Sequence, residues 1–430
     1  MNIKLVFTAL FIHVSACSQA QNGWTVCTAP YFASRIDDIF IIDGKTGYAV
    51  CGTGQIIKSV DSGNTWTTVF RDKNIYYRSV EFINAQKGFV GGFNPNGIYK
   101  DVFLKTVDGG FTWIDLTNTL DPLARNGICG LSAADSNTIY GCGNWYKDSA
   151  YIIKSTDGGN TWQLIPMYQY ASSLIDMYFL NKDTGFVTGK TSDSLNTAVI
   201  FYTTDGGKSW VKKFQNTDPD EYCWKIQRLT DRIYFASIED LGQHKPSILK
   251  STDGGMSWTK YFVYDVFYNI EGIGFIDSLR GFTGGGDNNS FESDDGGITW
   301  KQTSICPFMN RVFRVSDSVM FATGDRIWKY VLGTKGYTGP GYNPVYTSLK
   351  CFPNPVNGIL TIDANLSRST HAMLILFDDR GHRIKVIDNA DKSAGNYIYQ
   401  LNTDNMAQGV YFVLLKTHED QQVVKVLVSH

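Results

Sequence analysis

An eight-residue pattern, (Ser/Thr)-x-Asp-x-Gly-x-(Thr/Ser)-Trp, recurs six times between residues 59 and 300. Its tryptophans stand at positions 66, 113, 162, 210, 258 and 300, so they are 47, 49, 48, 48 and 42 residues apart. A fixed period of this length is the signature of a repeat architecture, in which one structural unit is stacked many times. This repeat constrains the fold more than any other feature of the chain.

Each repeat reads as four short strands. In the third repeat the box is preceded by the alternating strand Tyr151–Ser155, and in the fourth an apolar alternation over residues 175–180 is followed by a Gly-Phe-Val-Thr element at 185–188. A fourth strand starts at each tryptophan, as over residues 66–70. Four antiparallel strands every ~40–50 residues correspond to one blade of a β-propeller.

Six boxes indicate six blades, but strand-like sequence remains at both ends of the repeat region. Residues 311–315, 319–323 and 326–331 supply three further strands without a box, and residues 24–27 resemble the strand that follows a box. Joined together, they predict a seventh blade that the N-terminal strand closes. We therefore expect an all-β chain whose residues 21–331 form a seven-bladed β-propeller.

The repeated boxes resemble the Asp-box of sialidase-like propellers. The whole repeat, with its Gly-Tyr-Ala-Val strand at 47–50 and its Asp-Gly-Gly-x-Thr-Trp turn, is similar to the assembly-factor propellers of photosystem II and their bacterial relatives. The resemblance covers residues 24–331 and implies a fold. It does not imply one function, because this architecture carries enzymes, receptors and scaffolds.

The box residues are expected to be structural. An Asp side chain in such a turn accepts hydrogen bonds from turn amides, glycine allows positive φ, and Trp packs on neighbouring strands. One carboxylate per turn is too few for a calcium loop, so we expect neither a metal nor a cofactor there. The structural residues are Asp61, Asp108, Asp157, Asp205, Asp253, Asp295, Trp66, Trp113, Trp162, Trp210, Trp258 and Trp300.

The first 20 residues resemble an export signal. A basic start at Lys4 precedes an apolar stretch over residues 5–14, and Ser18-Gln19-Ala20 suits cleavage by signal peptidase. The alternative is lipidation of Cys17, because Val14-Ser15-Ala16-Cys17 resembles a bacterial lipobox.

The last residues form a second region. Residues 332–348 are rich in Gly and Pro and read as a linker. They are followed by FPNPVNGILTI at 352–362, LFDDRG at 376–381 and GVYFV at 409–413. These blocks resemble the C-terminal type A sorting domain of type IX secretion cargo. The resemblance implies that residues 349–430 form a small Ig-like β-sandwich, that the secretion machinery is a partner, and that the chain passes through the periplasm to the cell surface or the medium.

Charge and hydropathy exclude several classes of function. The chain has 39 basic and 41 acidic residues, so it lacks the basic surplus of an electrostatic nucleic-acid binder. No apolar run reaches the ~18–20 residues of a transmembrane helix. There is no Cys-x-x-Cys pair and there are only six histidines, so we expect no structural zinc site. Cys129 and Cys142 either pair across a hairpin or are buried as small apolar side chains. We expect a monomer.

The ligand is expected at the face opposite the boxes, where variable loops carry aromatic and charged residues. Such loops suit flat polar ligands such as glycans, or the surface of a protein partner. The candidate ligand-binding residues are Tyr77, Arg78, Trp145, Tyr146, Tyr222, Trp224 and Arg311.

Two other functions compete with this binding module. A sialidase-like glycosidase would gather arginines on a ligand carboxylate, from among Arg35, Arg78, Arg125 and Arg311. It would also need two carboxylates, for which Asp37, Asp38, Asp176 and Glu271 are candidates. However, the Phe-Arg-Ile-Pro motif of sialidases is absent, so we assign no catalytic residue and favour a protein without enzymatic activity. The third possibility is an assembly or scaffold role in the cell envelope.

Overall fold

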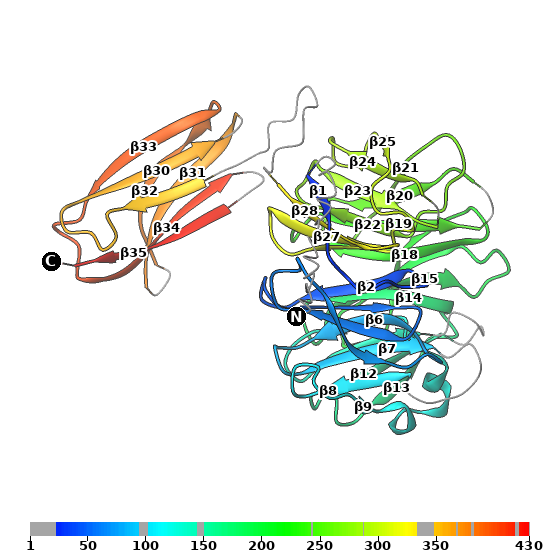
Figure 1. Cartoon of the computed structure of the whole chain (residues 1–430). Coiled ribbons are helices and arrows are strands. Elements are labelled where there is room, and N and C mark those ends of the chain that lie inside the picture. The colour runs from blue at the N-terminus through cyan, green and yellow to red at the C-terminus, as the bar shows by residue number, and fades with distance from the viewer. Residues whose placement is uncertain are drawn as a thin grey trace, which may run out of the picture. The chain divides into compact units, whose positions relative to one another are not determined.

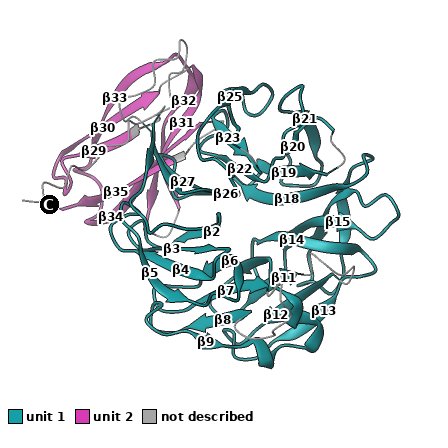
Figure 2. Ribbon diagram, turned by 45° about the vertical axis from the view of Figure 1, so that its right-hand side comes forward, with its two compact units in different colours: residues 1–337 teal, residues 338–430 magenta. Residues whose placement is uncertain are grey.

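The computed structural model describes residues 23–93, 102–143, 150–241, 244–286, 288–332, 348–366, 369–379, 382–417 and 421–429. The chain divides into two compact units, residues 1–337 and residues 338–430 (Figure 2). The expected signal over residues 1–20 and the lipobox cysteine Cys17 lie outside the described residues, as does most of the expected linker at 332–348.

The first unit is built from seven four-stranded antiparallel sheets among its described residues (Figure 1). The first strands are β2 (Ile36–Ile41), β6 (Tyr76–Phe82), β10 (Gly130–Ala133), β14 (Ala171–Phe179), β18 (Glu221–Arg228), β22 (Gly272–Phe275) and β26 (Arg311–Arg314). The second strands are β3 (Gly47–Cys51), β7 (Gly88–Phe93), β11 (Ile139–Gly143), β15 (Gly185–Thr191), β19 (Tyr234–Asp240), β23 (Gly281–Gly284) and β27 (Val319–Thr323).

In the first six sheets the third strand leads into a box and the fourth strand leaves it, whereas the last sheet has no box between its third and fourth strands. The third strands are β4 (Gln55–Ser59), β8 (Phe103–Thr106), β12 (Tyr151–Ser155), β16 (Ala198–Thr203), β20 (Ser247–Ser251), β24 (Ser290–Ser293) and β28 (Ile327–Val331). The fourth strands are β5 (Thr67–Arg71), β9 (Ile114–Asp115), β13 (Gln163–Pro166), β17 (Val211–Gln215), β21 (Thr259–Phe262), β25 (Lys301–Thr303) and, for the last sheet, β1 (Trp24–Val26). Two short 3₁₀ helices, η1 (Thr117–Thr119) and η2 (Pro122–Asn126), follow β9.

The sheets follow one another around a ring. The first strand of each sheet contacts the first strand of the next, and β26 of the last sheet contacts β2 of the first. The second strand β3 is buried along its whole length, whereas the fourth strand β5 is largely exposed. The first strands therefore line the axis of a β-propeller, each fourth strand lies at the rim, and apolar side chains fill the space between neighbouring blades.

The N-terminal strand closes the ring. β1 pairs antiparallel with β28, with Trp24 opposite Tyr330. The Trp24 side chain is fully buried, and its ring meets that of Phe282 edge-on at a centroid distance of 5.0 Å. The first and the last strands of the propeller thus belong to one sheet, as the repeat arithmetic predicts.

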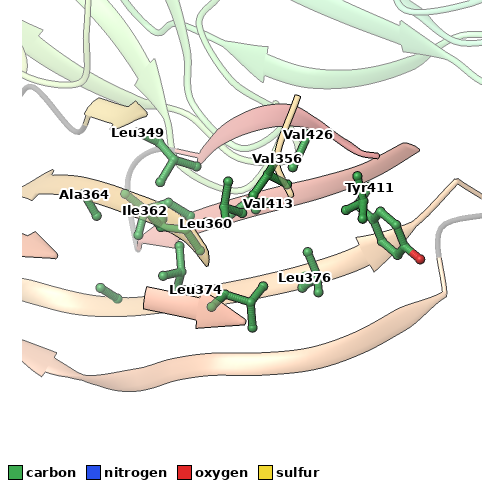
Figure 3. Close-up of a cluster of buried hydrophobic side chains, with 14 of the residues drawn as sticks. Leu349, Val356, Leu360, Ile362, Ala364, Leu374, Leu376, Tyr411, Val413 and Val426 are labelled. Carbon is green, nitrogen blue, oxygen red and sulfur yellow. The ribbon is translucent and has the colours of Figure 1, made fainter. Parts of the chain in front are cut away.

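The second unit contains two sheets. The three-stranded sheet has the order β29-β30-β33 and the four-stranded sheet the order β32-β31-β34-β35. The strands are β29 (Ser348–Phe352), β30 (Ile359–Leu366), β31 (Thr370–Asp378), β32 (Arg383–Lys392), β33 (Gly395–Asn402), β34 (Gly409–Thr417) and β35 (Gln421–Val428). Their core takes Leu360 and Ile362 from one sheet and Leu374 and Val413 from the other (Figure 3). This arrangement is consistent with the expected small β-sandwich.

The described residues include no helix long and apolar enough to cross a lipid bilayer.

Candidate functional site

Each Asp-box turn is closed by its own carboxylate. In the second blade, Asp108 Oδ1 accepts hydrogen bonds from the Thr112 amide (2.9 Å) and the Thr106 hydroxyl (2.9 Å). Asp108 Oδ2 accepts from the Thr112 hydroxyl at 2.6 Å. These hydrogen bonds, that of the Thr112 hydroxyl foremost, lower the pKa of Asp108 to about 2. Gly109 and Gly110 follow with φ of 70° and 77°, which glycine adopts without strain.

The other boxes repeat this geometry. The carboxylates of Asp61, Asp157, Asp205, Asp253 and Asp295 accept the same bonds from the box hydroxyls and the amide four residues on. Trp66 and Trp210 are buried, whereas Trp113, Trp162, Trp258 and Trp300 are half-buried. Because both oxygens of each carboxylate serve the turn, the boxes offer stability rather than a ligand site.

A lysine before several boxes donates hydrogen bonds to the neighbouring blade. This role was not predicted from the sequence. Lys105, next to the first box residue, donates to the Gly159 carbonyl (3.0 Å) and to Asn160 Oδ1 (2.9 Å) in the box of the next blade. Equivalent bonds to the next box are made by Lys58, Lys154, Lys250 and Lys329. The sequence does contain a pattern that marks these lysines. Directly before the Ser or Thr that opens a box stand Lys58, Lys105, Lys154 and Lys250.

The face opposite the box turns is called here the box-free face, and ion pairs between blades surround the axis there. Arg35, just before β2, contacts Asp37 through Nε (3.0 Å) and Glu271 of the sixth blade through Nη1 (2.7 Å). Burial acts to lower the pKa of Arg35, but the charges of Asp37 and Glu271 outweigh it and raise that pKa above its usual range.

A second set of ion pairs lies deeper along the first strands. Arg311 Nη1 lies 2.6 Å from Asp176 Oδ2, and Arg311 Nε lies 3.2 Å from Asp38 Oδ1. Asp38 also accepts the Val80 amide of the second blade (3.1 Å), and Asp176 accepts the Ile226 amide of the fifth blade (3.1 Å). These carboxylates therefore neutralise an arginine and join adjacent blades at the same time.

Glu239, near the end of β19, is a buried carboxyl group close to this network. Its side chain accepts a hydrogen bond from Asn269 (3.1 Å). Burial, followed by the negative charge of Glu271, raises the pKa of Glu239 to about 7. At neutral pH this group is therefore close to its midpoint of titration and can give up or take a proton.

A pocket of about 750 Å³ opens between the first and last blades. Its walls are the segment 26–35 that leads into β2, Tyr76 at the start of β6, Phe308 before β26, and Asp325 and Arg326 between β27 and β28. Tyr31 is 90% exposed and Phe308 42% exposed. Tyr76, Phe308, Asp325 and Arg326 stand where strands begin or end away from the boxes, so this part of the rim pocket lies at the box-free face. Thr28, at another part of its wall, is hydrogen-bonded to Asn64 and Trp66 of the first box.

The structure places four of the candidate ligand-binding residues in strands, where the sequence analysis expected loops. Tyr77 and Arg78 belong to β6, and Tyr222 and Trp224 belong to β18. Tyr77 and Trp224 are fully buried, and the Arg78 guanidinium lies 5.1 Å from the Trp224 ring, between blades. These four side chains are all buried, so none of them lies on the exposed surface around the rim pocket.

The remaining candidates divide into two groups. Arg311 keeps 21% of its side chain exposed, but it is engaged by Asp38 and Asp176. Trp145 and Tyr146 lie outside the described residues. The surface aromatics Tyr31 and Phe308 were missed, since neither stands in a motif and only the fold brings them together.

The described cysteines form no disulfide bond with one another, and all but Cys351 are buried. The amide of Cys129, just before β10, donates to the carbonyl of Cys142 in the adjacent strand β11 at 2.8 Å. Of the two interpretations of these cysteines, the structure shows the buried apolar one.

Comparisons with known proteins agree with this architecture. Residues 350–429 match the secretion system C-terminal sorting domain, and residues 201–212 and 291–302 match the BNR/Asp-box repeat. No curated protein matches the chain.

Among solved structures, the chain is similar to YCF48 bound to D1 peptide, with 18% identity and a TM-score of 0.55 over 73% of this chain and 99% of that one. YCF48 from Cyanidioschyzon merolae gives 16% identity and a TM-score of 0.55, over 72% of this chain and 99% of that one. An ancestral GH74 enzyme gives 13% identity and a TM-score of 0.52, over 94% of this chain and 64% of that one. At these identities the similarity shows the fold alone.

The sorting domain indicates export by type IX secretion to the cell surface or beyond. The chain is an Asp-box β-propeller that carries a type IX secretion sorting domain at its C-terminus.

Proposed function

We propose that the exported propeller is a binding module whose ligand occupies the rim pocket at the box-free face. The observation that carries the proposal is the pairing of exposed aromatic rings, Tyr31 and Phe308, with charged groups of Arg35, Asp325 and Arg326 around one cavity of about 750 Å³. Aromatic walls with a few polar groups are typical of ligand pockets. On the Asp-box face, the carboxylates of the boxes are used within their own turns.

Two ligand classes fit such a pocket. The apolar faces of sugar rings pack on exposed tyrosine and phenylalanine, while hydroxyl groups bond to charged side chains. An extended peptide can make the same kinds of contact, and the similar YCF48 structure contains a D1 peptide. We favour a glycan or a protein segment from outside the cell.

The arginines argue against a sialidase-like clamp on a ligand carboxylate. Arg35 is bound by Asp37 and Glu271, and Arg311 by Asp38 and Asp176. Arg125 donates to the carbonyls of Leu120 (3.0 Å) and Asn118 (3.2 Å). A ligand carboxylate would have to displace these partners.

A glycoside hydrolase is the second candidate, and one observation favours it. Glu239 has a pKa of about 7 and lies near Glu271, which Arg35 holds by an ion pair. A protonated and an ionised carboxyl group are the pair that glycoside hydrolysis requires.

A panel experiment separates these functions. The full chain is incubated with bacterial and host polysaccharides, sialylated glycans and a peptide library, and both binding and sugar release are measured. Binding without release supports the binding module. Release that disappears in Glu239→Gln would make the protein a hydrolase. If the chain binds no glycan and no peptide but co-purifies with an intact envelope protein, the scaffold role replaces our proposal.

A further inference from the structure

Three side chains in the fifth blade converge at the box-free face, away from the rim pocket. Glu221 is the first residue of β18, Asp240 is the last of β19, and His244 follows in the next connection. Glu221 and Asp240 face each other in the register of the two strands. One ligand atom from each of the three side chains lies within 4.8 Å of the others. His244 Nδ1 is 3.0 Å from Asp240 Oδ1.

The group carries more negative than positive charge. Lys260 Nζ lies 2.7 Å from Asp218 Oδ2 and 3.0 Å from Glu221 Oε1. The ammonium group of Lys260 thus pairs with two of the three carboxyl groups, and the third, that of Asp240, pairs with His244. The side chains of Glu221 and Asp240 are 0% and 1% exposed. Buried carboxylates are costly unless cations compensate them, and one divalent cation would balance this excess.

The surroundings hold two of these groups in place. The Asn216 amide group donates a hydrogen bond to Glu221. The amide of Leu241 donates to the Asp220 carbonyl (3.0 Å), which fixes the ends of the two strands to each other. In protein metal sites, hydrogen bonds from surrounding residues orient the side chains that bind the metal. The His244 side chain is 38% exposed and gives an ion access from solvent.

We propose that Glu221, Asp240 and His244 form a binding site for a divalent transition metal, with Zn²⁺ as the best fit. One imidazole nitrogen and two carboxylate oxygens suit Zn²⁺, and water can complete a tetrahedron. Ca²⁺ and Mg²⁺ fit less well, since they prefer oxygen ligands alone. The site would overturn the expectation of no metal, which considered only ligands close in sequence.

A simpler interpretation is a His–Asp pair at the protein surface without a metal. The C-terminal unit provides a matched example, because His382 Nδ1 lies 3.2 Å from Asp378 Oδ2 with the same four-residue spacing. Within the described residues, only the pair in the fifth blade is joined by a third side chain from among His, Cys, Asp and Glu. The two histidines therefore make a direct comparison.

The proposal is tested by Zn²⁺ binding to the metal-stripped full chain, measured by calorimetry and by metal analysis after dialysis. We expect one Zn²⁺ to bind in the fifth blade, a loss of at least about tenfold in affinity for His244→Ala and Asp240→Asn, and no change for His382→Ala. Lys260→Gln removes the competing ammonium and should tighten Zn²⁺ binding about tenfold or more. Ca²⁺ and Mg²⁺ serve as controls and should bind at least about tenfold more weakly.

Lys260→Gln separates metal binding from a merely structural role, because loss of folding would weaken binding and not strengthen it. The proposal is overturned if no Zn²⁺ binds, if His382→Ala abolishes binding while His244→Ala does not, or if Lys260→Gln weakens it in a folded protein. The readout is metal affinity, so it is independent of whether the rim pocket binds a glycan.

Discussion

Asp108 and Glu239 are both carboxyl groups, yet their surroundings shift their pKa values in opposite directions. The Asp108 carboxylate is half-buried and accepts three hydrogen bonds from its own turn, which favours its charged form. Glu239 is buried near another carboxylate, which favours its neutral form. The first group therefore adds stability when it is ionised, and the second costs stability when it is ionised.

This contrast predicts how acid affects the box turns. The folded-state pKa of Asp61, Asp108, Asp205 and Asp253 is about 2, below the ~3.9 of an unfolded aspartate. Their stabilisation is therefore complete above about pH 4 and is lost as pH falls through about 2. We expect the unfolding free energy, measured in urea from pH 5 to pH 2, to fall less steeply in Asp108→Asn than in the wild type. Asp317→Asn, on an exposed residue, should leave the slope unchanged. Equal slopes for wild type and Asp108→Asn would refute the role of the turn.

For Glu239 the pH dependence has the opposite sign. Its pKa rises from ~4.3 in the unfolded chain to about 7 in the fold, so its contribution to stability decreases as pH rises through this window. Glu239→Gln keeps an acceptor for Asn269 and removes the charge. We expect it to stabilise the protein by about 3–4 kcal/mol at pH 8 and by about a third of that at pH 5. Denaturant unfolding at both pH values measures this, and a pH-independent loss of stability would contradict it.

Individual box residues could be assigned from the sequence, but individual ligand contacts could not. The position of Asp108 in a turn motif determines its hydrogen bonds, which are local. The burial of Tyr77 and Trp224 depends on β6 and β18, in which the pairing register shifts next to Tyr77 and between Cys223 and Ile226. Such bulges change which face a side chain occupies, and no periodicity in the sequence reveals them.

At the level of elements, the bounds of a strand were predicted accurately where the strand ends at a sequence motif such as the box. The structure gives β12 as Tyr151–Ser155, as the sequence indicates, because the box turn fixes where that strand ends. The inner strands start earlier than expected, and β14 begins at Ala171 where the apolar alternation predicted residue 175. Contacts from neighbouring blades extend these strands, and such contacts are not visible in a single repeat.

The lysines that precede the boxes connect one element to the next. Lys105 is 7% exposed and satisfies a backbone carbonyl of the neighbouring blade. Lys105→Met keeps most of the side-chain volume and removes the hydrogen bonds, so we expect it to lower the unfolding free energy by about 1–3 kcal/mol. Lys208→Met, on an exposed lysine inside a box, should change it by less than about 0.5 kcal/mol. Equal effects in thermal or urea unfolding would show that the bond between blades contributes nothing.

On the scale of the whole molecule, the repeat predicted both the number of sheets and the way in which the ring closes. Trp24 has no box before it, and it was assigned to the last sheet because residues 311–331 lacked a fourth strand. The C-terminal region was identified by its sequence blocks rather than by physical reasoning about its fold. The rim pocket was not foreseen, since its walls come from the two ends of the propeller, which are about 300 residues apart in the sequence.

The proposed ligand binds in the rim pocket, away from the turns that the Asp-boxes use for stability. Two exposed aromatic residues, one in the rim pocket and one in a box, allow a matched comparison. Tyr31 lines the rim pocket and is 90% exposed, and Phe111 lies in the box of the second blade and is 83% exposed. Neither substitution by alanine removes a buried group, so both variants should fold like the wild type.

The most direct test is therefore the affinity of wild type, Tyr31→Ala and Phe111→Ala for whichever glycan or peptide the panel identifies. We predict that Tyr31→Ala weakens binding about tenfold or more, as expected for a central aromatic contact, and that Phe111→Ala has the affinity of the wild type. Loss of binding in Phe111→Ala, with Tyr31→Ala unaffected, would place the ligand on the Asp-box face and contradict the account.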